Sequence, residues 1–87
     1  MALADKAPDG WEVVNGHHLY RKYTFPDFKT ALEFVNRAGA IAEEQCHHPD
    51  LVLAWGRVEV TTYTHTADGL TGSDYLLAAA IDRAYTR

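Results

Sequence analysis

Histidines are the residues whose type and placement in this chain suggest chemistry. The 87-residue sequence holds five, and His47, His48 and His65 fall where helices or strands are expected to end. Functional side chains gather at such element ends. Histidine has an unperturbed pKa of about 6.5, so it gives or takes a proton at neutral pH. Two histidines at one cleft are therefore able to serve as the acid and the base of a proton-transfer reaction.

Two carboxylates are spaced to assist these histidines. Glu43 precedes His47 by four residues, which is one helical turn, and Asp74 lies at the expected start of the last helix. Either carboxylate would orient an imidazole. Structural alternatives stay open, because Glu43 is also typical of a solvated helix face and Asp74 completes a capping box that begins at Thr71.

Other chemistries fit the sequence less well. Neutral imidazoles bind zinc, but adjacent histidines such as His47 and His48 point to opposite sides of an extended chain, and HExxH and paired-cysteine motifs are missing. A nucleophilic Cys46 would need a histidine as its base, but adjacency in sequence seldom gives the required geometry, and a small buried thiol is the more common state. His17 and His18 are expected to be exposed hairpin residues without a role. We expect neither a metal nor a cofactor.

The first half of the chain should place Glu43, His47 and His48 at the end of a helix. Asn15-Gly16 between two β-prone runs predicts a hairpin with a type I′ turn. Apolar residues Phe28, Leu32, Val35, Ala38 and Ala42 then recur at steps of three or four, which predicts an amphipathic helix over about residues 27–45 with Asp27 as its N-cap. Pro49 prevents the helix from continuing.

The second half repeats this order. Leu51 to Trp55 and Val58 to His65 are expected to be strands around a Gly56-Arg57 turn, and a helix follows the Thr71 capping box. The order ββαββα predicts an α+β fold in which two helices cover one face of a four-stranded antiparallel sheet. The other face needs polar residues or a partner chain.

Length and composition narrow the class of protein. Eighty-seven residues, 47% of them hydrophobic, make a single domain over residues 1–87 with a loose start at 1–9, and its small core favours self-association. A net charge of -4 without a basic run argues against nucleic-acid binding. One cysteine, a start unlike a signal peptide and apolar runs of at most seven residues favour a cytoplasmic protein that does not span a membrane.

The histidines also stand in a longer pattern. Glu43-x-x-x-His47-His48-Pro49 is followed after five residues by Trp55, after nine more by His65 and after eight more by Asp74. This pattern resembles the signature of the pterin-4a-carbinolamine dehydratase family. The resemblance spans about residues 10–85 and includes Gly10-Trp11-Glu12, Phe25-Pro26-Asp27-Phe28, Phe34-Val35-Asn36 and Gly69-Leu70-Thr71.

Two positions differ from what is usual in that family. Members usually carry an extra N-terminal helix, but only ten residues precede Trp11, so we expect that helix to be short or missing. Leu51 stands where relatives often have an aromatic residue, and it would change one wall of a pterin pocket.

The resemblance implies a dehydratase that acts on 4a-hydroxytetrahydropterin and gives quinonoid dihydropterin, which recycles the pterin cofactor of aromatic amino acid hydroxylases. It implies that His47 and His65 are the acid and base and that His48 orients the pterin. It implies a substrate-binding set of Glu43, His48, Pro49, Trp55 and Asp74.

The family also implies an alternative function and an assembly state. Some members are non-catalytic assembly chaperones, for instance for Rubisco, and others are dimerisation cofactors of a transcription factor, so a protein partner is the alternative to a pterin. The complete histidine set favours the dehydratase, since a chaperone has no need of it. We expect a homodimer or homotetramer.

Overall fold

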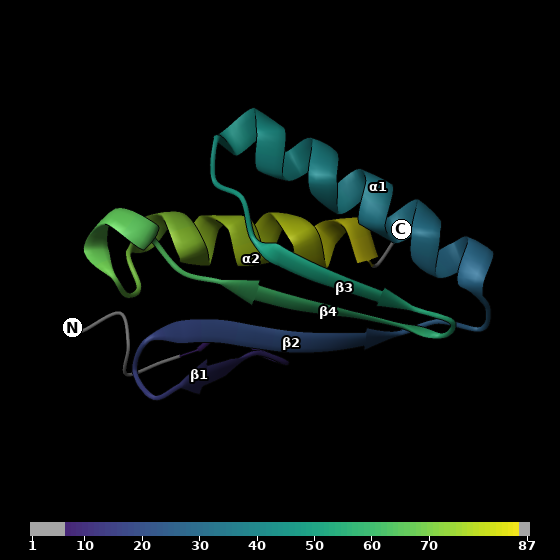
Figure 1. The fold of residues 1–87 in the computed structure, drawn as a ribbon, viewed down its shortest axis with the longest axis horizontal. Helices are drawn as coiled ribbons and strands as arrows, with labels where there is room; N and C mark the ends of the chain where they lie inside the picture. Colours follow the sequence, from purple (N-terminus) through teal and green to yellow (C-terminus); the bar gives the residue numbers. More distant parts are fainter. Residues whose placement is uncertain (1–6, 86–87) are drawn as a thin grey trace.

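One antiparallel sheet and two helices make up the described part of the chain. The computed structural model describes residues 7–85 and has the predicted α+β architecture, with the strand order β1-β2-β4-β3 (Figure 1). The elements are β1 (Glu12–Val14), β2 (His18–Thr24), α1 (Phe28–Gln45), β3 (Asp50–Ala54), β4 (Arg57–Thr62), the short 3-10 helix η2 (His65–Ala67) and α2 (Gly72–Tyr85).

The first hairpin turns where the sequence predicted. Asn15 and Gly16 both have positive φ, 54° and 63°, as a type I′ turn requires, and they leave Val14 paired with His18. The structure tests the expectation of a short or missing N-terminal helix only from residue 7 onward. Residues 1–6 lie outside the described residues, and residues 7–10 contain a turn rather than a helix.

Helix α1 begins as predicted, but its buried face is only partly the predicted one. Asp27 is its N-cap and accepts a 2.8 Å hydrogen bond from the backbone N–H of Thr30. Phe28 and Leu32, predicted to be inward-facing, remain 44% and 40% exposed. The buried face consists of Ala31, Phe34, Ala38 and Ala42, so Ala38 and Ala42 are buried as predicted, and Ala31 and Phe34 are buried in place of Phe28 and Leu32.

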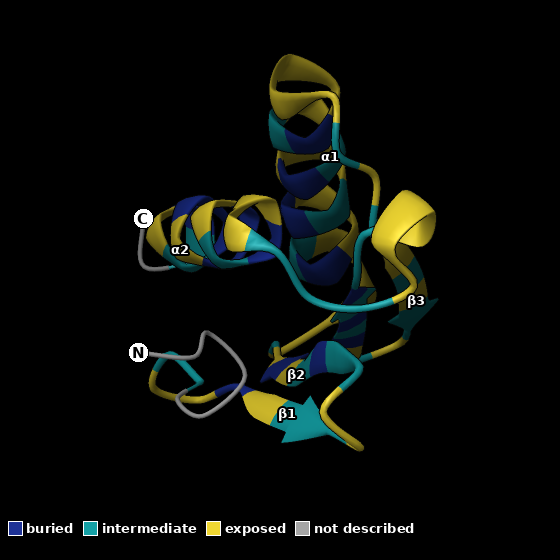
Figure 2. Cartoon of the chain, turned by 90° about the vertical axis from the view of Figure 1, so that its left-hand side faces the viewer, coloured by how far each residue is buried: buried dark blue, intermediate teal, exposed yellow. Residues whose placement is uncertain are grey.

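Both helices pack on the same face of the sheet. The inward positions of β2 and β4 alternate along each strand, and Figure 2 shows the buried residues where the helices face one another and the sheet. Thr62 and Asp74 are the buried polar residues of the described chain. The core that these elements share includes Leu19, Tyr23, Val58, Val60, Leu77, Ile81 and Ala84.

The carboxylate of Asp82 on α2 links the first hairpin to the helices. Asp82 accepts hydrogen bonds from the Trp11 indole at 3.1 Å, the Arg21 guanidinium at 2.9 Å and the Tyr23 hydroxyl at 2.5 Å. Burial and the bond to Asp82 raise the pKa of Tyr23 well above its ordinary value, so this phenol stays a donor. The N-terminal hairpin is thereby held against α2.

The β3–β4 hairpin determines where the histidines lie. Asp50 at the start of β3 pairs with Thr61 near the end of β4, so the residues before β3 and after β4 share one end of the sheet. The C-terminus of α1 leads into that end and α2 starts from it (Figure 1). His47, His48 and His65 therefore lie at the same end. Among the described helices, no segment has the length and apolar character needed to cross a membrane.

Candidate active site

The end of α1 directs His47 out of the helix. Cys46 adopts the left-handed conformation at φ 53°, and its N–H donates to the carbonyl of Glu43 at 3.2 Å. The N–H of His47 donates to the carbonyl of Ala42 at 3.1 Å, which completes a Schellman motif. The expectation of a buried Cys46 thiol is wrong, because at this turn the residue is exposed.

Asp74, at the start of α2, contacts polar groups from four parts of the chain. Its carboxylate is fully buried and lies 2.5 Å from Nε2 of His47. It accepts hydrogen bonds from the hydroxyls of Thr62 at 2.7 Å and Thr64 at 2.9 Å, and from the backbone N–H of Thr71 at 3.0 Å. One carboxylate thus joins β4, the segment after it, the residue before α2 and the second residue after α1.

The ionised state of Asp74 determines which ring nitrogen of His47 carries a proton. Burial by itself raises the pKa of Asp74, but the hydrogen bonds from His47, Thr62, Thr71 and Thr64 together outweigh it and hold the pKa below its ordinary value. An ionised carboxylate only accepts, so Nε2 of His47 must carry the hydrogen between them. In the neutral imidazole, Nδ1 is then the nitrogen with the free lone pair.

His65 is placed by a turn rather than a strand. The strand expected over Val58 to His65 ends at Thr62 in the structure, and His65 begins η2 instead. Thr64 pairs with Gly69 across the base of this turn. The imidazole of His65 stacks on the ring of Tyr63, with 4.5 Å between centroids and 25° between planes. The edge of the imidazole, which carries both nitrogens, is left available for hydrogen bonding.

The three predicted histidines meet at one cleft. It has a volume of about 290 Å³ and is bordered by the residues after α1 and those after β4. His47 and His48 come from the first segment and His65 from the second. The full lining is Cys46, His47, His48, Tyr63, Thr64, His65 and Thr66.

His48 and Glu43 form a pair at the surface beside the cleft. Nε2 of His48 lies 2.5 Å from Oε2 of Glu43, and their side chains are 61% and 78% exposed. The carboxylate of Glu43 thus pairs with His48, whereas His47 pairs with Asp74. Adjacent histidines therefore have different partners.

Four residues of the predicted binding set lie outside this lining. Glu43 and Asp74 each pair with a histidine of the lining, whereas in the described chain no such pairing links Pro49 or Trp55 to it. Pro49 stands between His48 and β3. Trp55 is 68% exposed at the turn between β3 and β4, at the opposite end of that hairpin from His47 and His65. Within residues 7–85, no group of three His, Cys, Asp or Glu side chains is placed to hold a metal ion.

Sequence reasoning missed the threonines and Tyr63. Thr62 follows Val58 and Val60 on the inward face of β4, so a polar residue there signals a buried partner. Thr64 continues the same alternation. Tyr63 carries no such signal, since its contact with His65 depends on the turn that the strand prediction did not include.

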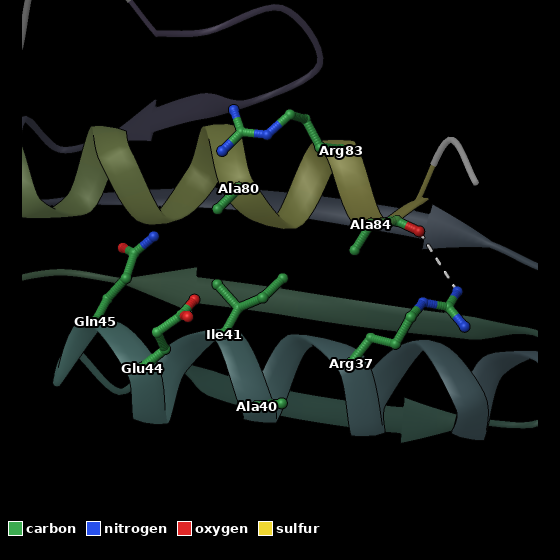
Figure 3. Close-up of a pocket in the computed structure, with 8 residues that line it drawn as sticks. All are labelled: Arg37, Ala40, Ile41, Glu44, Gln45, Ala80, Arg83 and Ala84. Carbon is green, nitrogen blue, oxygen red and sulfur yellow. Dashed lines mark hydrogen bonds between the residues drawn. The ribbon is translucent and has the colours of Figure 1, made fainter.

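Other hollows are present in the described part of the chain. One, of about 400 Å³, lies between α1 and α2, where Arg37 donates to the carbonyl of Ala84 at 3.4 Å (Figure 3). None of the predicted site residues line it. A hollow of about 370 Å³ has His47 in its wall, together with Gln45, Ser73, Leu76, Ala79 and Arg83.

Comparison with known proteins gives a consistent result. The family model described as pterin 4 alpha carbinolamine dehydratase matches residues 1–84. A protein of Rubrobacter xylanophilus named "Putative pterin-4-alpha-carbinolamine dehydratase" is 57% identical over 81 residues, which are 93% of this chain and 75% of that protein. A Rickettsia bellii protein of the same name is 49% identical over 80 residues, 92% of this chain and 71% of its own length.

Two solved structures share the fold. A transcriptional coactivator/pterin dehydratase from Brucella melitensis superposes with a TM-score of 0.86 at 37% identity, covering 94% of this chain and 88% of that one. A pterin dehydratase-like RuBisCO assembly factor of the alpha-carboxysome has a TM-score of 0.71 at 18% identity, with 86% of each chain covered, and at that identity it shows the fold alone. The family match over nearly the whole chain, together with these relatives, shows that the chain belongs to the pterin-4-alpha-carbinolamine dehydratase family.

Proposed function

We propose that this protein is a dehydratase that removes water from 4a-hydroxytetrahydropterin and releases quinonoid dihydropterin. The observation that carries the proposal is the meeting of His47 and His65 at one cleft, with His47 held by the buried carboxylate of Asp74. Family membership supplies the substrate class.

The reaction needs one acid and one base. The bond between carbon 4a and its hydroxyl oxygen breaks, and the acid protonates that oxygen so that it leaves as water. The base takes the proton from the neighbouring ring N–H, whose electrons form the new C=N bond. One proton is given and one is taken, so the elimination is complete with two imidazoles.

His47 is suited to exchange its proton at Nδ1. Asp74 accepts the Nε2–H whether the imidazole is neutral or charged, so the carboxylate keeps the ring in one orientation. The proton that moves to or from the pterin is therefore the one on Nδ1.

His65 supplies the second proton-transfer group from the other side of the cleft. Its stacking on Tyr63 covers ring surface and leaves the nitrogen-bearing edge available. His48, paired with Glu43 at the surface, is proposed to orient the pterin. The roles proposed for Pro49 and Trp55 rest on the family signature alone, because neither lines this cleft.

The test compares dehydration of 4a-hydroxytetrahydropterin with and without the protein by following the absorbance of the quinonoid product. We expect the protein to accelerate the reaction by a factor on the order of 10² or more, in keeping with general acid–base catalysis. Val52→Ala is a suitable control variant, because Val52 is half-exposed on β3 outside the cleft and should leave the rate unchanged.

An unchanged rate would replace this proposal with the second one, a non-catalytic protein-binding role. That alternative draws on the shared fold of the RuBisCO assembly factor. A non-catalytic protein-binding role gives no reason for His47 to be held by a buried carboxylate.

A further inference from the structure

His17 contacts the turn that carries His65, although the proposed reaction does not use it. It was expected to be an exposed hairpin residue, but only 34% of its side chain is exposed. Its ring lies 4.5 Å from the ring of Tyr63, at an angle of 44°. Since Tyr63 also stacks on His65, one tyrosine ring contacts both imidazoles.

The second contact of His17 lies on the far side of the same turn. Its Nε2 is 2.9 Å from Oδ1 of Asp68. Asp68 follows η2 as its C-cap in the left-handed conformation at φ 50°, which Asp adopts more readily than most L residues. His17 therefore contacts the residue two before His65 and the residue three after it.

The neighbouring histidine orients this ring. Nδ1 of His18 is 3.1 Å from Nδ1 of His17, so one of these two nitrogens carries the hydrogen. When His17 is neutral and donates its Nε2–H to Asp68, its Nδ1 accepts the hydrogen bond from His18. Both nitrogens of His17 are thus engaged in a defined arrangement.

We propose that His17 is a positioning residue for His65. Through Tyr63 and Asp68 it fixes both ends of the turn, so that the His65 imidazole is held at the cleft. The catalytic part of this inference rests on the proposed dehydratase function, whereas the position of His65 is measurable without it.

Nuclear magnetic resonance of the histidine side chains gives the direct readout. Stacking on Tyr63 shifts the ring-proton resonances of His65 upfield from those of a free histidine. Tyr63→Phe keeps the aromatic ring and should preserve this shift, while Tyr63→Leu should abolish it. His17→Ala should move the His65 resonances toward free-histidine values, because the turn is released at both ends.

Kinetics supply the second readout. We expect His17→Ala and Tyr63→Leu to lower kcat about tenfold with a smaller change in KM, since a misplaced acid or base slows the chemical step. Tyr63→Phe should restore kcat to near the wild-type value. Tyr20→Leu is the matched control: Tyr20 donates to Glu59 at 2.9 Å on β4, and its loss should change neither kcat nor the His65 resonances.

The outcomes are distinct. Wild-type His65 resonances in the His17→Ala variant would overturn the inference, even if that variant were less stable or less active. A wild-type protein without dehydratase activity would overturn the proposed function instead. In that case, movement of the His65 resonances in His17→Ala would still support the positioning role.

Discussion

Asp74 serves two purposes with one carboxylate. It accepts the backbone N–H of Thr71 at 3.0 Å, as the capping box predicted, and it also lies 2.5 Å from Nε2 of His47. The sequence leaves both roles open, and the two can coexist. A capping motif describes only the local turn, whereas the contact with His47 depends on how α1 ends.

The first prediction concerns the charge of Asp74. Asp74→Asn puts an amide where the site supplies donors, so we expect a loss of about 2–4 kcal/mol in the free energy of unfolding at neutral pH. The native pKa is below the unfolded value of about 3.9, so the stability due to the charge is present above that pH. It is lost as the pH falls through the lower native pKa.

Urea denaturation of both proteins at pH 7 and at progressively lower pH measures this difference. The stability gap between wild type and Asp74→Asn should narrow below about pH 4. A gap of constant size across this range would show that the carboxylate charge adds nothing to folding.

The second prediction separates the roles of the three histidines. His47→Ala and His65→Ala should each lower kcat by roughly 10²-fold or more, because each removes a proton-transfer group. His48→Ala should instead raise KM several-fold with little change in kcat, since an orienting group acts on binding. Steady-state kinetics test this division, and a loss of kcat confined to His48→Ala would reverse the assignment.

At the scale of elements, two turns bring the site together. The Schellman motif at Cys46 ends α1 so that His47, on the way to β3, contacts Asp74 at the start of α2, and the turn at η2 follows β4. The type and order of the strands and helices followed from patterning, and so did the Asn15-Gly16 turn and the Asp27 cap.

The turn at η2 could not be predicted from local sequence. The run from Thr61 to Thr64 is typical of a strand by propensity. In the structure, Thr64 donates to Asp74 and pairs with Gly69 instead of extending β4. The contacts of Tyr63 and His17 with this turn depend on that tertiary arrangement, so local patterning carries no sign of them.

The third prediction uses the conformation of Cys46. A non-glycine residue at φ 53° is strained, and glycine is the preferred residue at this position of a helix end. Cys46→Gly should therefore stabilise the protein by about 0.5–1 kcal/mol, which raises the Tm by roughly 2–8 °C for a domain of this size. Thermal denaturation measures this change in Tm. Gly39→Ala, inside α1, is measured beside it as a second helix variant. A lower Tm for Cys46→Gly would contradict the proposed strain.

At the scale of the whole molecule, the sheet ends in a strand with an unpaired edge in the described chain. β3 is outermost in the order β1-β2-β4-β3, and it presents Val52 at 49% exposure, with Trp55 in the turn beyond it. Exposed apolar side chains on an edge strand favour pairing with another chain.

The fourth prediction is therefore self-association into a homodimer or homotetramer. Light scattering at micromolar concentration should report a mass at least twice that of one chain. Val52→Lys places a charge on the edge strand and should lower the mass. Lys22→Ala on the internal strand β2 is a control that should not. A monomeric wild-type protein would refute the prediction.

The most direct test of the central proposal is the dehydration rate of 4a-hydroxytetrahydropterin with wild-type protein and with the His47→Ala/His65→Ala double variant. If these two histidines carry the two proton transfers, the wild type accelerates the reaction and the folded double variant falls close to the uncatalysed rate. A double variant that retains the wild-type rate would contradict the assignment of the acid and the base.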